Sequence, residues 1–124
     1  MLIGEYLNIM ENIEINIFNI VGNSFCVEAN DGEKVYTLLK KAVENNKKVI
    51  LSFQNVEMLT PAFLNTAIGQ IYRDFDEELI KKLLSADNIL PEDKVLLKRV
   101  TKTAKLFYKN PERMLQSINK ILGE

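Results

Sequence analysis

The residues with the greatest potential for chemistry form two charged groups. The first is an acidic cluster on both sides of position 75, made of Asp74, Asp76, Glu77 and Glu78. Two carboxylates of such a cluster could bind Mg²⁺, which prefers oxygen ligands. The cluster lacks the glycine turn and the spaced ligands of a calcium loop, and runs of charge are usually solvated surfaces. We therefore predict no metal site in this chain.

The second group is a basic stripe near the end of the chain. Its lysines recur every three or four residues, which places them on one face of a predicted helix over 91–108: Lys94, Lys98, Lys102, Lys105 and Lys109. Aromatic and base-reading side chains are not interleaved with them, and the net charge of the chain is −1. A solvated helix face is our first interpretation. Binding of a nucleic acid or of an acidic protein is the alternative.

Several residue types that catalysis commonly requires are missing. The chain has no histidine, which excludes Ser-His-Asp and Cys-His catalytic groups. Its single cysteine, Cys26, cannot complete a zinc site, and its five glycines never approach the spacing of a phosphate-binding loop. We therefore predict that the protein is not an enzyme and needs no cofactor. Cys26 lies in an apolar triplet, so we interpret it as a core residue.

Length and composition predict a single domain. The 124 residues include 47% hydrophobic residues, which is enough for one packed core, and 27% charged residues. No apolar run is long enough to cross a membrane, and the first residues lack the pattern of a secretory signal. One cysteine allows no internal disulfide, which fits a reducing compartment. We expect a cytoplasmic protein without membrane contact.

In the first part of the chain, apolar periodicity predicts strands and a helix. Alternating isoleucines predict a strand over 13–20, and residues 25–27 are expected to form a short second strand. A capping box over 30–33 predicts the start of a helix that ends at 45–46. The apolar face of this helix consists of Val35, Leu38, Leu39, Ala42 and Val43.

The second part of the chain continues this alternation. The apolar run 47–53 predicts a strand buried on both faces, and Thr60-Pro61 is a strong start signal for a helix over 61–73. A short helix or a strand around 83–85 precedes the long helix over 91–108. The pattern predicts an α/β domain whose small mixed or parallel sheet is covered by helices.

We expect one folding unit with additions at both ends. The domain itself covers residues 13–109, and residues 1–12 form an N-terminal extension. A last amphipathic helix over 110–124 is expected to pack on the same domain, and homodimer formation through it is the alternative.

The stretch VILSFQNVEMLTPAFL, from Val49 to Leu64, resembles the central strand, loop and helix of STAS-like domains. These domains are relatives of bacterial anti-sigma-factor antagonists, and the looser similarity extends from residue 15 to residue 107. Phe63-Leu64 and Gly69-Gln70-Ile71-Tyr72 make the chain most similar to the STAS-like family of unknown function. The resemblance implies a STAS-like sheet and a regulatory partner protein, such as an ATP-binding kinase-like or anti-sigma-type protein.

The phosphate-accepting loop of such antagonists differs here. That loop normally reads Asp-Ser-Ser-Gly, and the resemblance places Thr60, Pro61, Ala62 and Phe63 at those positions. Because proline has no hydroxyl, the resemblance argues against the phosphorylation cycle of the antagonists. Thr60 is the remaining hydroxyl of the loop, and we interpret it as the N-cap of the helix. A regulatory phosphothreonine is the alternative, since phosphate is favoured at a helix N-terminus.

We expect a partner to dock on this loop and on the exposed side of the helix that follows. The helix must bury Leu64, Ile68, Ile71 and Tyr72, which leaves its polar residues exposed. The expected partner-binding residues are Asn55, Glu57, Thr60, Asn65, Thr66 and Gln70. Docking would act by competition between partners. Gly69 lowers helix stability, so we expect a close approach of another element at this position.

Overall fold

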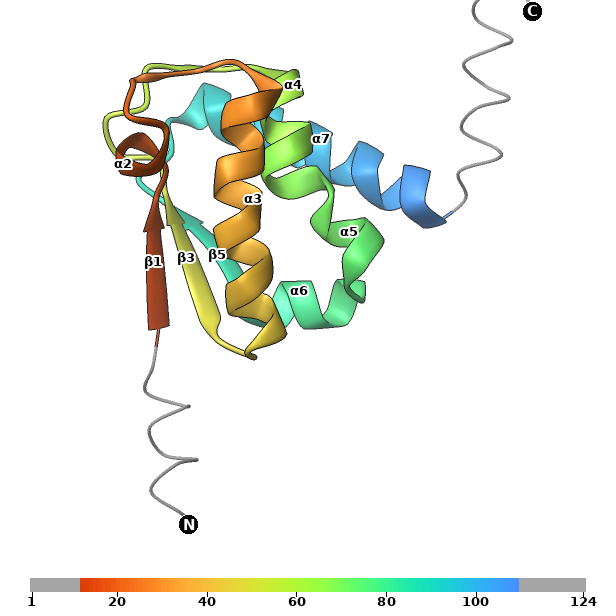
Figure 1. Ribbon diagram of the computed structural model, residues 1–124. Helices are drawn as coiled ribbons and strands as arrows, with labels where there is room; N and C mark the ends of the chain where they lie inside the picture. The colour runs from red at the N-terminus through yellow and green to blue at the C-terminus, as the bar shows by residue number, and fades with distance from the viewer. Residues whose placement is uncertain (1–11, 110–124) are drawn as a thin grey trace, which may run out of the picture.

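The computed structural model describes residues 12–109. Within these residues, a three-stranded parallel sheet is formed by β1 (Asn12–Asn16), β3 (Lys48–Ser52) and β5 (Leu84–Asp87) in the order β1-β3-β5 (Figure 1). β3 pairs in parallel with both neighbours. The predicted α/β class and the strand predicted in the apolar run 47–53 are therefore confirmed, and this strand is the interior one.

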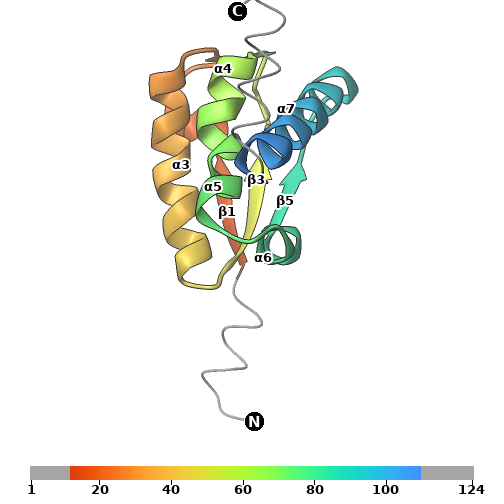
Figure 2. The ribbon, with the colours of Figure 1, turned by 90° about the vertical axis from the view of Figure 1, so that its right-hand side faces the viewer.

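The helices lie on one face of this sheet. Figure 2 shows α3 (Ala29–Glu44) on one side and α7 (Pro91–Lys109) on the other side of a central helix, which spans residues 61–74 and covers the sheet. No described helix covers the opposite face, where Glu14, Ile50 and Ser85 lie in register. The expectation that the third strand is buried on both faces is therefore wrong, since Ile50 is only half-buried and Lys48 is exposed.

The first strand is shorter than expected because its last residue caps a helix. The side chain of Asn16 accepts a hydrogen bond from the backbone nitrogen of Asn19, and α2 (Ile17–Val21) begins there. Gly22 ends this helix with a φ of 77°, in the left-handed region that glycine adopts without strain. Residues 17–20 are thus helical, and their apolar alternation was misleading.

Helix α3 starts earlier than expected, and it buries Val35, Leu39, Ala42 and Val43 of its predicted apolar face. Its N-cap is Glu28, without a side-chain hydrogen bond, so the predicted capping box over 30–33 is wrong. The predicted end is confirmed, because Asn45 is the C-cap and Asn46 has a positive φ. Leu38 is 45% exposed, whereas Tyr36 is buried.

The predicted helix over 61–73 forms, with a change of winding in its middle. It consists of α4 (Pro61–Leu64), the π-helical segment η1 (Asn65–Gly69) and α5 (Ile71–Asp74). The backbone nitrogen of Gln70 bonds to the carbonyl oxygen of Asn65 at 3.1 Å, the wide spacing of a π-helix. Helix α6 (Glu77–Leu83) then runs directly into β5, so both a helix and a strand occur around 83–85.

Two further strands form a separate, parallel two-stranded sheet. β2 (Phe25–Cys26) pairs with β4 (Met58–Leu59), and the backbone nitrogens of Glu57 and Met58 donate to the carbonyl oxygen of Ser24. The expected short strand over 25–27 is therefore present in part. Its partner β4 lies in a segment that sequence patterns indicate as a loop.

The two additions at the chain ends lie outside the described residues. These are the N-terminal extension, of which residues 1–11 are not described, and the last amphipathic helix over 110–124. In the part that is described, no helix has the length and apolar character that a membrane crossing requires.

Helix α3 lies very close to α4 at Gly32. A Cβ atom at this position would lie 2.7 Å from the carbonyl oxygen of Phe63 and 2.8 Å from Oγ1 of Thr66. At Gly69, where we expected a close approach, a Cβ would make an ordinary 3.6 Å contact with the Cβ of Ala104. The packing of α3 on α4 thus depends on a glycine, and the packing of η1 on α7 does not.

This difference gives a stability prediction for two matched substitutions. We expect Gly32→Ala to lower the free energy of unfolding by about 1–3 kcal/mol, because the backbone of α4 must move away. Gly69→Ala should leave stability unchanged or raise it by up to about 1 kcal/mol through helix propensity. Urea denaturation of both variants measures the difference. Equal effects of the two substitutions would contradict the close contact at Gly32.

Candidate functional site

Thr60 joins the loop before α4 to the segment before α3. Its Oγ1 accepts a hydrogen bond from the backbone nitrogen of Phe63 at 3.2 Å, which confirms the predicted N-cap. The same hydroxyl donates to the carbonyl oxygen of Val27 at 2.6 Å. A phosphate on Thr60 would remove this donor, so the phosphothreonine alternative requires the link to Val27 to break.

Beside Thr60, two large apolar side chains are exposed on neighbouring strands. The parallel register pairs Phe25 with Met58 and Cys26 with Leu59. Because side chains alternate along a strand, Cys26 and Leu59 face the core while Phe25 and Met58 face outward. Phe25 and Met58 are each 50% exposed. We call Phe25, Asn55, Glu57, Met58 and Pro61 the ribbon surface; all five are exposed.

The loop of the ribbon surface has a well-defined backbone. The backbone nitrogen of Phe53 bonds to Asp87, and that of Val56 bonds back to Phe53 at 3.1 Å. Asn55 has a φ of 66°, a conformation that asparagine tolerates better than most residues, and Val56 is buried. The loop therefore holds Asn55 and Glu57 at fixed positions, and Ser24 donates a further hydrogen bond to the Glu57 carboxylate.

The remaining expected partner-binding residues lie on the helix that follows the ribbon surface. Asn65 is exposed as expected. Thr66 is half-buried, and its hydroxyl donates to the carbonyl oxygen of Ala62 at 2.7 Å. Gln70 is half-buried too, and its amide donates to Glu33 at 2.9 Å. Both side chains are thus less free than expected, since the Thr66 hydroxyl bonds within its own helix and the Gln70 amide bonds to α3. Their part in partner binding stays a prediction.

The acidic cluster is divided between two sets of internal contacts. Asp74 accepts hydrogen bonds from Arg73 and from the Tyr36 hydroxyl, and Lys40 lies 3.8 Å away. The hydrogen bonds from Arg73, together with that from Tyr36, lower the pKa of Asp74 to about 2. Glu77 instead pairs with Lys105 at 3.2 Å. Among residues 12–109, no group of three or more potential ligands is arranged to hold a metal ion.

The basic stripe lies on α7, and one of its five lysines, Lys105, is engaged in internal contacts. Lys94, Lys98, Lys102 and Lys109 are exposed. Lys105 pairs with Glu77 and lies 5.5 Å from the centre of the Tyr72 ring. The stripe is thus a cationic surface interrupted near its C-terminal end.

Cys26 is a core residue, as predicted. It is fully buried, and burial raises the pKa of its thiol to about 11. A thiol with this pKa is almost entirely protonated at neutral pH, which makes it a poor nucleophile.

Sequence patterns missed the exposed pair of Phe25 and Met58, because 33 positions separate the two residues and only the pairing of β2 with β4 brings their side chains together.

Comparison with known proteins gives one match. Residues 31–94 match the family described as STAS-like domain of unknown function (DUF4325). The match runs from the first turn of α3 to the first turn of α7 and includes the loop of the ribbon surface. No curated protein and no solved structure matches the chain.

The two hydrogen bonds of Thr60 predict the effects of two substitutions. Thr60→Ala should lower the free energy of unfolding by about 1–2 kcal/mol, because the helix loses its cap and Val27 its donor. Thr60→Ser should retain most of the stability, since serine supplies the same hydroxyl. Thermal and urea unfolding test this. Equal losses in both variants would show that the methyl group, and not the hydroxyl, is important.

The contacts of Asp74 predict a pH dependence of stability. Its pKa in the folded protein is lowered to about 2, so the stabilisation is complete above about pH 4 and is lost as the pH falls toward 2. Asp74→Asn should therefore lower the free energy of unfolding by up to about 2 kcal/mol at pH 7 and flatten the acid limb of the stability profile. Asp76→Asn, at an exposed position, is the control. Identical acid limbs in both variants would contradict the role of Asp74.

Proposed function

Because the chain belongs to the family of STAS-like domains of unknown function, we propose that it is a non-enzymatic regulatory module that docks to a partner protein. The observation that supports this proposal most is the exposed apolar pair of Phe25 and Met58. The pair lies beside the loop where the related antagonists carry their phosphate-accepting serine. We propose the cytoplasm as the place where it acts.

The ribbon surface has the physical properties of a docking site. Burying an exposed apolar side chain contributes about 1.5–3 kcal/mol, so completing the burial of two half-exposed side chains contributes roughly that amount together. The hydrogen bonds of the loop reduce the loss of conformational entropy that binding requires. Asn55 and Glu57 supply polar contacts at the rim, which favour one orientation of the partner.

The proposed mechanism is competition. A partner that occupies the ribbon surface is withheld from a second protein, and no covalent bond is made or broken. The similarity to anti-sigma-factor antagonists suggests an ATP-binding kinase-like or anti-sigma-type protein as the partner. Pro61 has no hydroxyl and the Thr60 hydroxyl is bonded internally, so control in this proposal comes from the amounts of the partners rather than from phosphorylation of this loop.

An alternative function uses the basic stripe. Four lysines are exposed on one side of α7, which supports electrostatic binding of a nucleic acid or of an acidic protein. Such binding would weaken steeply as salt is added, whereas docking through Phe25 and Met58 would depend little on salt. The double variant Lys98→Glu with Lys102→Glu would abolish binding through the basic stripe.

Capture with matched variants tests the proposal. The tagged full chain is immobilised as wild type, as Met58→Arg, as Leu106→Arg and as the double variant Lys98→Glu with Lys102→Glu. Proteins retained from an extract of the native host are quantified by mass spectrometry. Leu106 is the control, because it is 53% exposed, compared with 50% for Met58, and lies on α7. We expect a protein that wild type and Leu106→Arg retain and that Met58→Arg loses, since arginine brings an unpaired charge into the interface.

Two outcomes would contradict this function. If no retained protein depends on Met58, the ribbon surface is not a docking site. If the double lysine variant loses the retained molecules while Met58→Arg keeps them, the basic stripe is the functional surface. Circular dichroism of each variant checks that the fold is preserved.

A further inference from the structure

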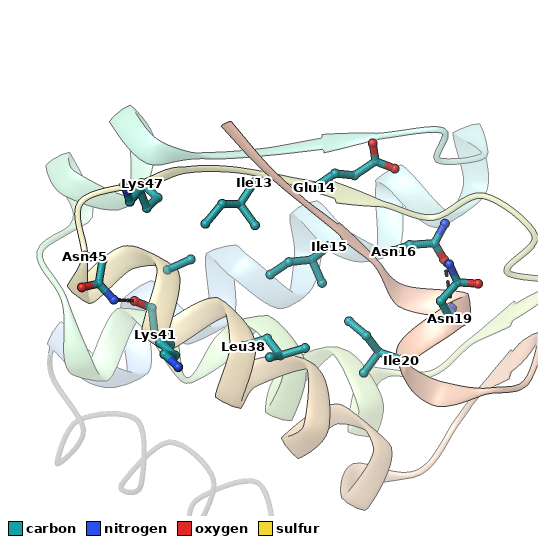
Figure 3. Close-up of a pocket in the computed structure, with 11 residues that line it drawn as sticks. Ile13, Glu14, Ile15, Asn16, Asn19, Ile20, Leu38, Lys41, Asn45 and Lys47 are labelled. Carbon is teal, nitrogen blue, oxygen red and sulfur yellow. Dashed lines mark hydrogen bonds between the residues drawn. The ribbon is translucent and has the colours of Figure 1, made fainter. Parts of the chain in front are cut away.

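A groove follows the outer edge of β1, between this strand, α2 and α3 (Figure 3). Its volume is about 530 Å³. The groove is lined mainly by apolar side chains from all three elements: Ile13, Ile15, Ile20, Leu38 and Ala42. Leu38 is 45% exposed although it is a large apolar residue. The groove is therefore an apolar surface that remains accessible.

The strand that forms one wall of the groove is an edge strand. β1 pairs with β3 on one side, and among residues 12–109 no other strand pairs with it. The backbone N–H and C=O groups on the outer side of an edge strand are a template for another strand. Five residues of β1 offer an edge of about 16 Å, given the rise of about 3.3 Å per residue in a parallel strand.

The charges of the groove differ between its two ends. Lys41, Asn45 and Lys47 lie at one end, and Asn16 and Asn19 lie at the other (Figure 3). Lys41 makes no ion pair with any residue between 12 and 109. Glu14 belongs to β1, but Figure 3 shows its carboxylate on the far side of the strand from Leu38. The groove thus has an apolar middle, and the Lys41 ammonium group lies at one end of it.

We propose that an extended peptide segment of a partner protein binds in this groove by adding a strand to β1. Side chains of an added strand alternate between the two faces of the sheet, so every second one would enter the groove and contact Ile15, Leu38 and Ala42. These side chains must be apolar, and an acidic residue of the segment faces Lys41. The site shares no residue with the ribbon surface, and this inference does not rest on the proposed function.

Selection from random peptides tests the pattern that the groove requires. A library of random linear peptides displayed on phage is selected against the full chain and counter-selected against Leu38→Glu. We expect enriched sequences with apolar residues at every second position and an acidic residue at one end. Their affinity should fall by about tenfold or more for Leu38→Glu and for Lys41→Glu, and remain at the wild-type level for Leu106→Glu and Met58→Arg.

Backbone methylation tests the pairing itself. An enriched peptide is synthesised with N-methyl groups on one set of alternate amides, and again with the methyl groups on the other set. Both peptides carry the side chains of the parent. Because an added strand uses only one set of its amides to bond to the edge, one methylated peptide should lose binding and the other should keep it.

The inference is overturned by any of four results. These are no enrichment, apolar residues spaced by three and four as in a helix, binding that Leu38→Glu leaves unchanged, and equal behaviour of the two methylated peptides. Two measurements on the full chain test whether something other than a partner peptide occupies the edge of β1. Sedimentation detects a second copy of the chain, and hydrogen exchange detects a segment of the chain itself. A dimer that Leu38→Glu dissociates means that a second copy covers the edge. Protection of the outer β1 amides in the monomer without peptide means that the chain itself covers it.

Discussion

The contact of α3 with α4 at Gly32 is the constraint on which the rest of the structure depends. The carbonyl oxygen of Phe63 occupies the space that a side chain at position 32 would need. Phe63 and Leu64 of α4 are fully buried, and α4 lies between α3 and α7 (Figure 2). Because Thr60 caps α4, the same contact determines where the loop before this helix lies.

The ribbon surface follows from this placement. Thr60 bonds to Val27 and thereby holds the segment before α3 against the loop before α4. These two segments carry β2 and β4, whose register turns Cys26 and Leu59 inward and leaves Phe25 and Met58 outside. The exposed pair is thus a consequence of core packing, since the strands cannot bury both of their faces. A surface of this kind is rigid without a ligand, which favours recognition.

The placement of the helices on one face of the sheet leaves β1 with an apolar edge. Val35 and Leu39 of α3 are buried, whereas Leu38 is 45% exposed and lines the groove beside β1 (Figure 3). A parallel sheet with helices on one face only has surfaces that a doubly covered sheet lacks. The protein therefore has two separate apolar surfaces, the ribbon surface and the β1 groove. The two proposed sites share no residue, so the two proposals together predict that two partners bind without excluding one another.

Local sequence signals determined the elements whose ends depend on neighbouring residues only. Thr60-Pro61 indicated the start of the central helix, Asn45-Asn46 the end of α3, and the apolar run over 49–53 the interior strand. The family resemblance rested on the same stretch. Only the tertiary structure decided the conformation or the exposure of several other residues. Ile17 is helical because Asn16 caps α2, and Leu38 is 45% exposed because no element of the described residues fully covers its side of α3. Phe25 and Met58 meet only through pairing of distant segments, because periodicity indicates which side chains share a face but not which element covers that face.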